Sequence, residues 1–476
     1  MIPGSEMAVV DANAEALGVP RKQLMESSGN AVAREVRAVA DPGAAVTVVA
    51  GRGNNGGDAL VAARFLDDYD LRVCLLGRAE TMGSSIAREN WTALERAGYD
   101  TREVRDSTAL ELGAPDVAVD AMLGTGVSGT LREPEATAAA ALAASAATVV
   151  SVDVPSGLDT ETGERAENAV DPDRVVTFHE TKPGLAALDV PVTVADIGIP
   201  QAAQLFVGRG DLLRLDRAPT SHKGDHGEVL VVGGGPYTGA PALTAQAALR
   251  AGADLVRVAC PRPVADQIQS YSESLIVRPV DGERIRPEHV GRLATLAAEH
   301  DTTVVGPGLG TAESTLDAVG SLLEVVDSGP VVVDADALRV VPGTRTDASL
   351  VCTPHQGELA EMGGPSREDT DERRAAVESF AADLGVTLLV KGHHDVVSDG
   401  ERTRVNRTGN PGMTVGGTGD VLAGVTGALA ARLGAVDAAA VGAYATGRAG
   451  DLAVSGDGDG LLAMDLLEGL PGALRR

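Results

Sequence analysis

Short apolar runs, most of them rich in valine, alternate along the whole chain with longer segments rich in alanine, leucine and arginine. The runs predict buried strands and the longer segments predict helices. Strand, helix and strand in repeated order is typical of a parallel sheet that helices cover on both faces. The runs in the first half are AVTVVAG (45–51), LRVCLLG (71–77), DVAVDAMLG (116–124), ATVVSVDVPSG (147–157), RVVTF (174–178) and PVTVADIG (191–198). Those in the second half are GEVLVVGGG (227–235), DLVRVAC (254–260), TTVVGPGLG (302–310), PVVVDADAL (330–338), ASLVCTPH (348–355) and TLLVKG (387–392).

A polar segment, VGRGDLLRLDRAPTSHKGDHG (207–227), separates the two series of strands. The two halves share no motif, so the sequence predicts two different α/β domains, each with three layers, over residues 1–212 and 213–476. A chain of 476 residues is also too long for one typical core. Ligands of open parallel sheets bind beyond the carboxyl ends of the strands, so the glycine-rich turns after strands are the places to search.

The chain is strongly acidic, with a formal net charge of −28. Such a surface repels nucleic acid and anionic membrane, so neither is an expected partner. Lysine is scarce, because only Lys22, Lys182, Lys223 and Lys391 occur. An acidic, lysine-poor chain suits a very salty cytoplasm, which predicts a halophilic archaeon as the source. The N-terminus has no basic region followed by an apolar core, so we expect a cytoplasmic protein.

The three cysteines, Cys74, Cys260 and Cys352, lie far apart and form no C-x-x-C motif. This spacing favours neither a zinc site nor a disulfide framework.

The first glycine-rich turn reads GRGNNGGDALVAARFL (51–66). Gly51, Gly53 and Gly56 fit the G-x-G-x-x-G pattern between a strand and a helix, and such a helix start favours phosphate. A redox cofactor would need an acidic residue after the next strand, where Arg78 stands instead, although an arginine could meet a ribose phosphate. The loop also carries Asn54, Asn55 and Asp58, whose oxygens suit a hydroxylated substrate or a hard cation.

Two further carboxylates, Asp120 and Asp153, each lie near the end of a predicted strand. The carboxyl ends of parallel strands meet at one edge, so both should converge with the loop at residues 54–58. A single such carboxylate is commonly a turn former, but two beside an Asn/Asp loop favour a hard cation or a polar substrate.

The stretches GRGNNGGDALVAARFL, DAMLGTGVSGTLREP, VDVPSGLDTETG and KPGL occur in this order and resemble the Rossmann-like epimerase domain of the NAD(P)H-hydrate repair enzymes. That domain interconverts the R and S forms of hydrated NADH and NADPH. The resemblance implies a potassium ion near Asn55, Asp120 and Ser156, and makes Asp153 the first candidate for proton transfer. Ala59 departs from the family's usual glycine. The resemblance further implies that the substrate contacts Asn54, Asn55, Gly56, Gly57, Asp58, Gly124, Thr125, Gly126, Val127, Ser128, Gly129, Thr130 and Asp153.

The second half contains the densest glycine run, GNPGMTVGGTGDVLAG (409–424). It is not a Walker loop, because no Lys-Ser or Lys-Thr follows the glycines. The amides of residues 417–420 can hold an anion as charge develops, and Asp420 can accept a proton from an attacking hydroxyl. This pairing predicts phosphoryl transfer to an alcohol. Lys391, one of the few lysines, follows another strand and suits phosphate binding.

The second half resembles the ribokinase-like dehydratase domain of the same enzymes through HKGDHG, YTGAPALTA, GPGLG, DADAL, TPHQGE, KGHHD and GNPGMTVGGTGD. That domain dehydrates the S hydrate at the expense of a nucleotide. The resemblance implies ADP as co-substrate with magnesium, and release of AMP and phosphate. Asp395 and Val415 depart from the family's usual threonines. The resemblance implies hydrate contacts from Ala240, Gly308, His355 and Asp420, and nucleotide contacts from Lys391, Gly392, His393, His394, Asp395 and Gly419.

Two other functions fit part of the pattern. A vitamin or sugar kinase fused to a dinucleotide-binding regulatory domain would share GGTGD, and would make a stable phosphate ester. A nucleotide-sensing protein would bind without turnover, but Asp420 and Lys391 argue against it. We expect a homo-oligomer, although no feature of the sequence defines the number of subunits.

Overall fold

The computed structural model describes residues 1–126, 129–367, 369–457 and 460–475, and it divides the chain into two compact units, 1–203 and 204–476. The sequence places the division at 212/213. Residues 204–212 belong to the second unit because they pair with its last strand. Phe206 forms a β-bridge with Val405, and the guanidinium of Arg404 donates to the buried carboxylate of Asp211 at 2.9 Å.

The first unit is built on a parallel sheet, seven-stranded in the described residues, in the order β3-β2-β1-β4-β5-β6-β7. The order reverses between β1 and β4, which is where a ligand is expected. The strands are β1 (Ala45–Ala50), β2 (Asp70–Leu76), β3 (Asp100–Val104), β4 (Val117–Ala121), β5 (Thr148–Val152), β6 (Arg174–Phe178) and β7 (Val192–Ala195).

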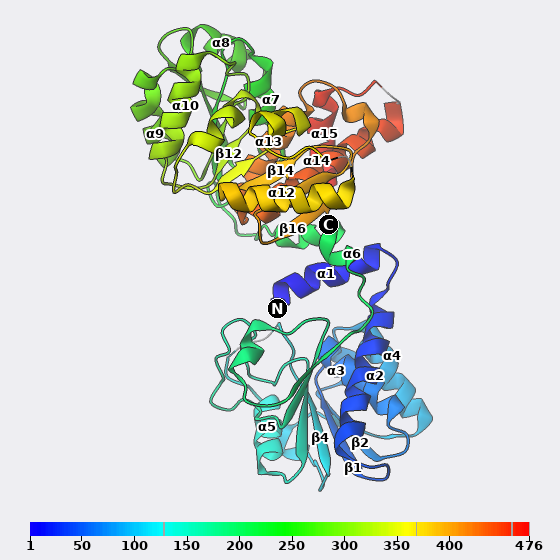
Figure 1. Cartoon of the computed structure of the whole chain (residues 1–476). Coiled ribbons are helices and arrows are strands. Elements are labelled where there is room, and N and C mark those ends of the chain that lie inside the picture. Colours follow the sequence, from blue (N-terminus) through cyan, green and yellow to red (C-terminus); the bar gives the residue numbers. More distant parts are fainter. Residues whose placement is uncertain (127–128, 368, 458–459, 476) are drawn as a thin grey trace. The chain divides into compact units, whose positions relative to one another are not determined.

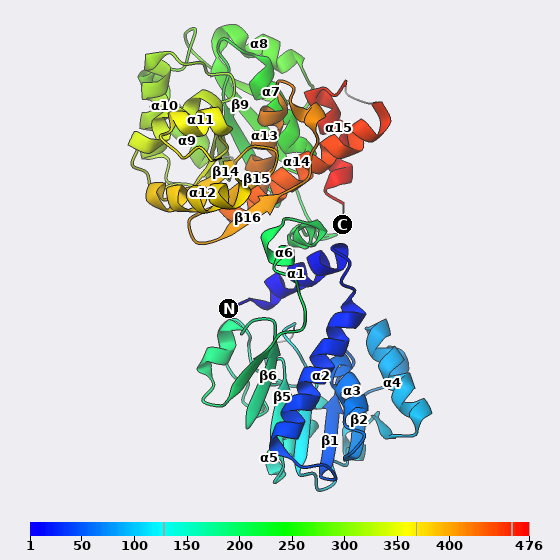
Figure 2. The ribbon, with the colours of Figure 1, turned by 45° about the vertical axis from the view of Figure 1, so that its right-hand side comes forward.

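Helices cover both faces of this sheet, because alternate strand residues point to opposite sides. On one face Val48 and Val119 pack with Val32 and Leu60 of the helices α2 and α3, and on the other face Val49 packs with residues of α5. Figure 2 shows the same layers. The helices are α1 (Gly4–Ala16), α2 (Arg21–Val39), α3 (Asn54–Phe65), α4 (Ser85–Ala97) and α5 (Glu135–Ala144), and the short α6 (Ala202–Leu205) lies at the division.

The second unit is built on a larger sheet, nine-stranded in the described residues, in the order β10-β9-β8-β11-β12-β13-β14-β15-β16. Its order reverses between β8 and β11. The strands from β10 to β14 are parallel, whereas β14, β15 and β16 pair antiparallel. The strands are β8 (Glu228–Val232), β9 (Leu255–Pro261), β10 (Ile276–Val280), β11 (Thr302–Val305), β12 (Val331–Val333), β13 (Leu350–Cys352), β14 (Thr387–Val390), β15 (Asp395–Ser398) and β16 (Thr403–Asn406).

Two apolar clusters lie on the two faces of this sheet. One joins Val231 and Val304 to α7, α13, α14 and α15, and the other joins Val232 and Val305 to α9, α10 and α12. The three-layer arrangement predicted for each domain is therefore confirmed. The helices are α7 (Gly239–Arg250), α8 (Arg262–Ser270), α9 (Val290–Ala298), α10 (Glu313–Val325), α11 (Gln356–Glu361), α12 (Thr370–Leu384), α13 (Thr418–Ala430), α14 (Ala435–Asp457) and α15 (Ala463–Ala473).

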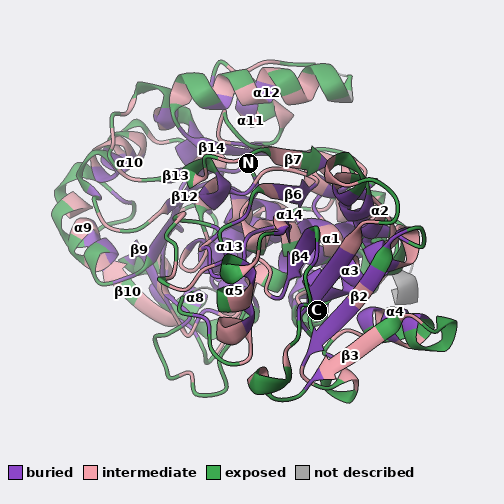
Figure 3. Cartoon of the chain, turned by 90° about the horizontal axis from the view of Figure 1, so that it is seen from below, coloured by how far each residue is buried: buried purple, intermediate pink, exposed green. Residues whose placement is uncertain are grey.

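Four strands at or next to sheet edges are the elements that the apolar pattern did not predict, whereas it did predict the edge strand β7. The strands β3, β10, β15 and β16 lie at or next to an edge of their sheet, and β3 is mostly half-buried while its neighbour β2 is largely buried (Figure 3). An edge strand needs no continuous apolar run, because one side of it faces solvent. Among the helices in the described ranges, none is both long and apolar enough for a membrane span.

Candidate active sites

A cavity of about 490 Å³ opens in the first unit at the carboxyl ends of β1 and β4, where the strand order reverses. Side chains from α1, α2, α3 and the loops after β4 and β5 line it. The polar residues of its wall are Asp11, Arg21, Ser28, Arg52, Asn54, Asn55, Asp58, Thr125, Glu135, Asp153 and Lys182.

The glycines of GRGNNGGD bring the backbone of this cavity together. A Cβ at Gly51 would lie 1.9 Å from the carbonyl oxygen of Met122, and a Cβ at Gly56 would lie 2.1 Å from that of Gly51. Only glycine allows both approaches. The loop after β1 therefore lies directly against the loop after β4, and Asn54, Asn55 and Asp58 follow on the first turns of α3.

Asp153, in the loop after β5, is one of the residues that line this cavity. Its backbone has a φ of 62°, a left-handed conformation that is strained for a residue with a side chain and typical of functional sites. The ammonium of Lys182 lies 2.6 Å from its carboxylate, and the hydroxyl of Thr177 donates to the same oxygen at 3.0 Å. Lys182 also donates to Thr177 at 2.9 Å and to the carbonyl of Phe178 at 3.0 Å, so this buried lysine has fixed partners.

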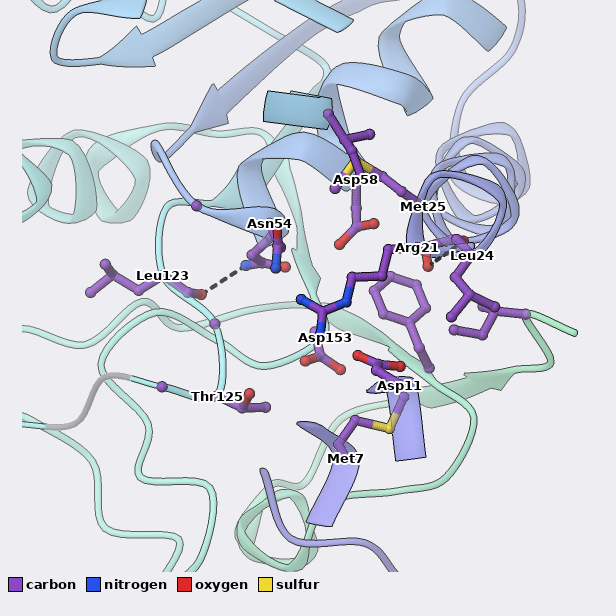
Figure 4. Close-up of a pocket in the computed structure, with 18 of the residues that line it drawn as sticks. Met7, Asp11, Arg21, Leu24, Met25, Asn54, Asp58, Leu123, Thr125 and Asp153 are labelled. Atoms are coloured by element: carbon purple, nitrogen blue, oxygen red, sulfur yellow. Dashed lines mark hydrogen bonds between the residues drawn. The ribbon is translucent and has the colours of Figure 1, made fainter. Parts of the chain in front are cut away.

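Two further carboxyl groups share the cavity with Asp153. Figure 4 shows the carboxyl of Asp58 pointing toward the side on which Asp153 and Asp11 lie, with Arg21 reaching between them in this view. Burial raises the pKa of Asp58 well above its usual value, and the charges of Asp153 and Asp11 add to the rise. Burial also raises the pKa of Asp11 to about 6, against the opposing charges of Arg21 and Lys182.

Asn55, Asp120 and Ser156 form one hydrogen-bonded chain beneath the cavity. The amide of Asn55 donates to the carbonyl of Leu123 at 2.8 Å, the N–H of Leu123 donates to Ser156 at 3.0 Å, and the Ser156 hydroxyl donates to Asp120 at 2.6 Å. Asp120 is fully buried. The Oδ1 atom of Asn55 is buried, and no described residue bonds to it.

Most residues expected at this site lie together. Asn54, Asn55, Asp58, Gly124, Thr125, Gly126 and Asp153 line the cavity. Gly56 and Gly57 do not line the cavity, and Gly57 packs against Met25 and Ala87. Gly129 and Thr130 are not among the lining residues. Val127 and Ser128 lie outside the described residues.

A cavity of about 410 Å³ in the second unit lies between the loop after β14, the loop after β16 and the helices α13 and α14. It contains Lys391, Gly392, His393, Asp395 and Gly419, five of the six residues expected to contact the nucleotide, while His394 is not in its wall. The other lining residues are Thr408, Gly409, Asn410, Pro411, Met413, Thr414, Thr418, Leu422, Ala443, Thr446 and Gly447.

Lys391 lines this cavity and lies beside two carboxylates. Its ammonium is 3.1 Å from Asp334 and 3.5 Å from Glu358. Burial opposes its charge, but these two carboxylates still hold the pKa of Lys391 above its usual value. Asp334, itself buried, also accepts a hydrogen bond from Thr353 at 2.7 Å.

Asp420 lies in the first turn of α13, directly after the glycine turn. Burial raises the pKa of Asp420 to about 7, Asp334 and Glu358 add to the rise, and Lys391 opposes it. The hydroxyl of Thr244 on α7 donates to the carbonyl of Asp420 at 3.0 Å and fixes the start of the helix. A carboxyl group with a pKa near 7 beside exposed amides is poised to accept a proton at neutral pH.

None of the residues expected to contact the hydrate, namely Ala240, Gly308, His355 and Asp420, is in the wall of this cavity. Ala240 lies one turn before Thr244 on α7, and Gly308 packs against the carbonyl of Tyr237 in the adjoining loop. His355 begins α11, where its ring nitrogen accepts the N–H of Gly357 at 2.9 Å, and it forms a β-bridge with Lys391.

Asp395 has a structural role that its sequence position did not reveal. Its carboxylate accepts the N–H of Gly392 at 3.0 Å and the amide of Asn406 at 3.0 Å. Burial raises the pKa of Asp395, and the hydrogen bonds from Asn406 and Gly392 oppose the rise. Through these hydrogen bonds the side chain stabilises the turn at residues 391–395, so its effect on the site is more than electrostatic repulsion of phosphate groups.

Sequence reasoning missed three polar residues of these sites, Asp11, Arg21 and Asp334, and it missed the contact between Lys182 and Asp153. Asp334 carried a signal, because it follows the strand PVVV as a strand-end carboxylate. Asp11 and Arg21 carried none, since they come from helices that precede the first strand and reach its carboxyl end only through packing.

Two family models match the chain. One described as NAD(P)H-hydrate dehydratase matches residues 229–472, and one described as YjeF-related protein N-terminus matches residues 21–184. A crystal structure of an ADP/ATP-dependent NAD(P)H-hydrate dehydratase from Bacillus subtilis, co-crystallised with ATP and Mg²⁺, is 25% identical, covers 56% of this chain and 97% of its own, and has a TM-score of 0.48.

Relatives similar over nearly the whole chain are bifunctional NAD(P)H-hydrate repair enzymes. That of Methanothermobacter thermautotrophicus is 44% identical and covers 98% of this chain and 94% of its own length. That of Pyrobaculum aerophilum is 44% identical, and that of Archaeoglobus fulgidus is 42% identical, and each covers 100% of this chain and 98% of its own length.

Proposed function

The chain belongs to the family of bifunctional NAD(P)H-hydrate repair enzymes, and from this premise we propose how its two cavities divide the two reactions. The first unit carries the epimerase and the second carries the dehydratase. The observation that carries the division is that each cavity lies within one unit and has its own candidate proton acceptor, because Asp153 lines the first cavity and Asp420 directly follows Gly419 of the second.

Epimerisation inverts the carbon that bears the added hydroxyl, so a proton must be delivered on one face and removed on the other. Two carboxyl groups in contrasting environments suit this task. Asp153 is ion-paired with Lys182 and serves as the base, while Asp58, whose pKa burial raises, serves as the acid. The hydroxyl leaves as water with the proton of Asp58, and a water that adds to the opposite face gives its proton to Asp153.

Potassium fits the residues beneath this cavity. The donors are amide, carboxylate and hydroxyl oxygens, the ligand type of hard cations, and the Oδ1 atom of Asn55 is a buried acceptor with no partner in the described residues. Asn55, Asp120 and Ser156 would hold the ion, which would supply positive charge beside the substrate. The chain's own hydrogen bonds from Asn55 and Ser156 fix the loop that carries Gly124 and Thr125.

In the second unit, Asp420 accepts the proton of the substrate hydroxyl as that oxygen attacks the terminal phosphate of ADP. Lys391 and the amides at the start of α13 stabilise the charge that develops on the phosphate. AMP leaves, and loss of the new phosphate ester as free phosphate, with loss of a proton from the neighbouring carbon, restores the reduced nicotinamide.

Magnesium would accompany the nucleotide in this site. The described residues hold no cluster of three His, Cys, Asp or Glu side chains placed for a metal. Magnesium commonly binds through one or two carboxylates together with substrate phosphates, and Asp334 and Glu358 beside Lys391 would be the carboxylates to hold it.

The test is the return of reduced-nicotinamide absorbance from hydrated NADH, with ADP and magnesium, in the full chain. The parent should convert both R and S forms completely, and Asp153→Ala should convert only the S form. A kinase would instead make a stable phosphate ester from ATP and an alcohol. No return of absorbance from either form would contradict the proposal.

A further inference from the structure

One turnover of the proposed epimerase leaves its acid and its base in exchanged protonation states. Asp58 gives its proton to the departing hydroxyl, and Asp153 takes a proton from the water that adds to the opposite face. One water leaves and one water adds, so the hydrate gains and loses the same atoms, but a proton has moved from Asp58 to Asp153. A turnover in the reverse direction resets the pair. Net conversion of the R form, from which the dehydratase removes the S form, needs another route for the proton to return.

Asp11 on α1 has the placement that this return needs. It lines the same cavity as Asp58 and Asp153. The charge of Asp11 adds to the raised pKa of Asp58, and the charge of Asp153 adds to the raised pKa of Asp11, so the three carboxyl groups lie within electrostatic reach of one another. Whereas Asp153 is held by Lys182 and Thr177, none of the described residues forms a hydrogen bond or an ion pair with Asp11. Its carboxyl group is therefore available to exchange protons.

The helix α1 holds Asp11 between the core and solvent. Val10 and Ala14 are buried in the core of the first unit, whereas Ala8 and Glu15 are exposed. Because an α-helix has 3.6 residues per turn, Asp11 lies at the boundary between these two faces, and the residue is half-buried. Its carboxyl group thus meets both the cavity and water.

The start of α1 is fixed to two loops of the same site. The N–H of Ile2 donates at 2.9 Å to the carbonyl of Thr181, the residue directly before the buried lysine of this cavity. A Cβ at Gly4 would lie 3.0 Å from the Cβ of Thr125 in the loop after β4. These backbone contacts make Asp11 a fixed part of the cavity wall.

The charges around Asp11 leave it able to exchange protons near neutral pH. Burial raises the pKa of Asp11 to about 6. The positive charges of Arg21 and Lys182 lower it, and the negative charges of Asp153 and Glu15 raise it. A group that transfers protons works best when its pKa lies near the working pH.

We propose that Asp11 is the proton relay of the epimerase, which returns a proton from Asp153 to Asp58 after each net conversion of the R hydrate to the S hydrate. The inference rests on the proposed function, in which these two residues are the base and the acid. The carboxylate of Asp11 accepts the proton of Asp153 and passes a proton to the carboxylate of Asp58, so that none is gained or lost overall. Asp11 acts through these two groups and needs no contact with the hydrate.

Asp11→Asn tests the relay, because it keeps the size of the side chain and removes its titration. Return of reduced-nicotinamide absorbance from the R hydrate, with ADP and magnesium in the full chain, measures net epimerisation when the S hydrate reacts faster. At low buffer concentration the variant should convert the R form about tenfold more slowly or worse, and the S form at the parental rate. Imidazole, a small acid and base with a pKa near neutral, should restore the rate in a saturable manner. Sodium chloride at the same ionic strength should not.

Three further variants are the controls. Asp11→Glu keeps a carboxyl group and should retain most of the rate at low buffer concentration. Glu15→Gln removes a charge from the same helix, one turn further on and outside the wall of this cavity, and should match the parent. Asp153→Ala gives the background rate, including any conversion that imidazole catalyses without the site.

A parental rate of Asp11→Asn at low buffer concentration would overturn the relay. A loss that imidazole does not restore, or the same buffer-dependent loss in Glu15→Gln, would overturn it too. Asp153→Ala separates this failure from failure of the proposed function. If Asp153→Ala is inactive toward the R form while Asp11→Asn is parental, only the relay is wrong. If Asp153→Ala converts the R form as the parent does, the base is assigned wrongly and both proposals fall.

Discussion

Asp420→Asn should abolish dehydration and at the same time stabilise the protein. The amide keeps the shape of the carboxyl group but cannot take the proton of the attacking hydroxyl. Loss of a general base costs about two to four powers of ten in rate. ADP should still bind, since Lys391 and the amides of α13 are unchanged, and epimerisation should be untouched because Asp420 lies in the other unit.

The stability gain follows from the pKa of Asp420, which rises from 3.8 to about 7 in the folded protein. The unfolded chain therefore loses its proton at lower pH than the folded chain does. The free energy of unfolding contributed by this group falls as pH rises from about 4 to about 7, and is constant above that. A shift of about 3 units corresponds to at most about 4 kcal/mol, at 1.36 kcal/mol per unit.

Two measurements check this pair of effects. Single-turnover release of AMP from ADP with hydrated NADH gives the rate, and denaturant unfolding at pH 8 and pH 5 gives the stability. We expect the variant to be more stable than the parent at pH 8, with a smaller difference at pH 5. Turnover within tenfold of the parent would refute Asp420 as the base. Unchanged stability at pH 8 would refute the raised pKa.

Three further outcomes are expected. Asp153→Ala should remove epimerisation and leave dehydration of the S form intact, which separate assays of the R and S hydrates can show; normal interconversion would move the proton-transfer role to another residue. Gly419→Ala should slow dehydration by about tenfold or more through the anion-binding contacts, because its Cβ would lie 3.3 Å from the ammonium of Lys391; an unaffected rate would argue against phosphate at this turn. ADP should support faster dehydration than ATP at equal concentration, and the reverse order in a side-by-side assay would assign ATP as the donor.

Central strands and glycine turns could be predicted from the sequence because their causes are local. A strand buried on both faces must be apolar throughout, as in AVTVVAG, so it stands out from its neighbours. The turn at Gly51 and Gly56 tolerates no side chain, so its glycines are visible as a motif. Asp153 and Asp420 were found for the same reason, since each directly follows such an element.

The resemblance to a known family supplied what local patterns could not. The pattern alone left open a redox cofactor, a cation or a sugar-like substrate at the first turn. The order of several motifs along both halves favoured one family, and the full-length relatives confirmed it. The sequence thus determined the family and the two fold types before any contact was known.

Only the tertiary structure decided which distant side chains act together. Lys182 lies 2.6 Å from Asp153, and Lys391 lies 3.1 Å from Asp334, although each pair is far apart along the chain. The half-polar edge strands such as β3 gave no apolar run, because their burial depends on neighbours. The sequence by itself determined elements and motifs, because these follow from local periodicity and backbone sterics, whereas the charge pairs, pKa values and cavity walls depend on long-range packing.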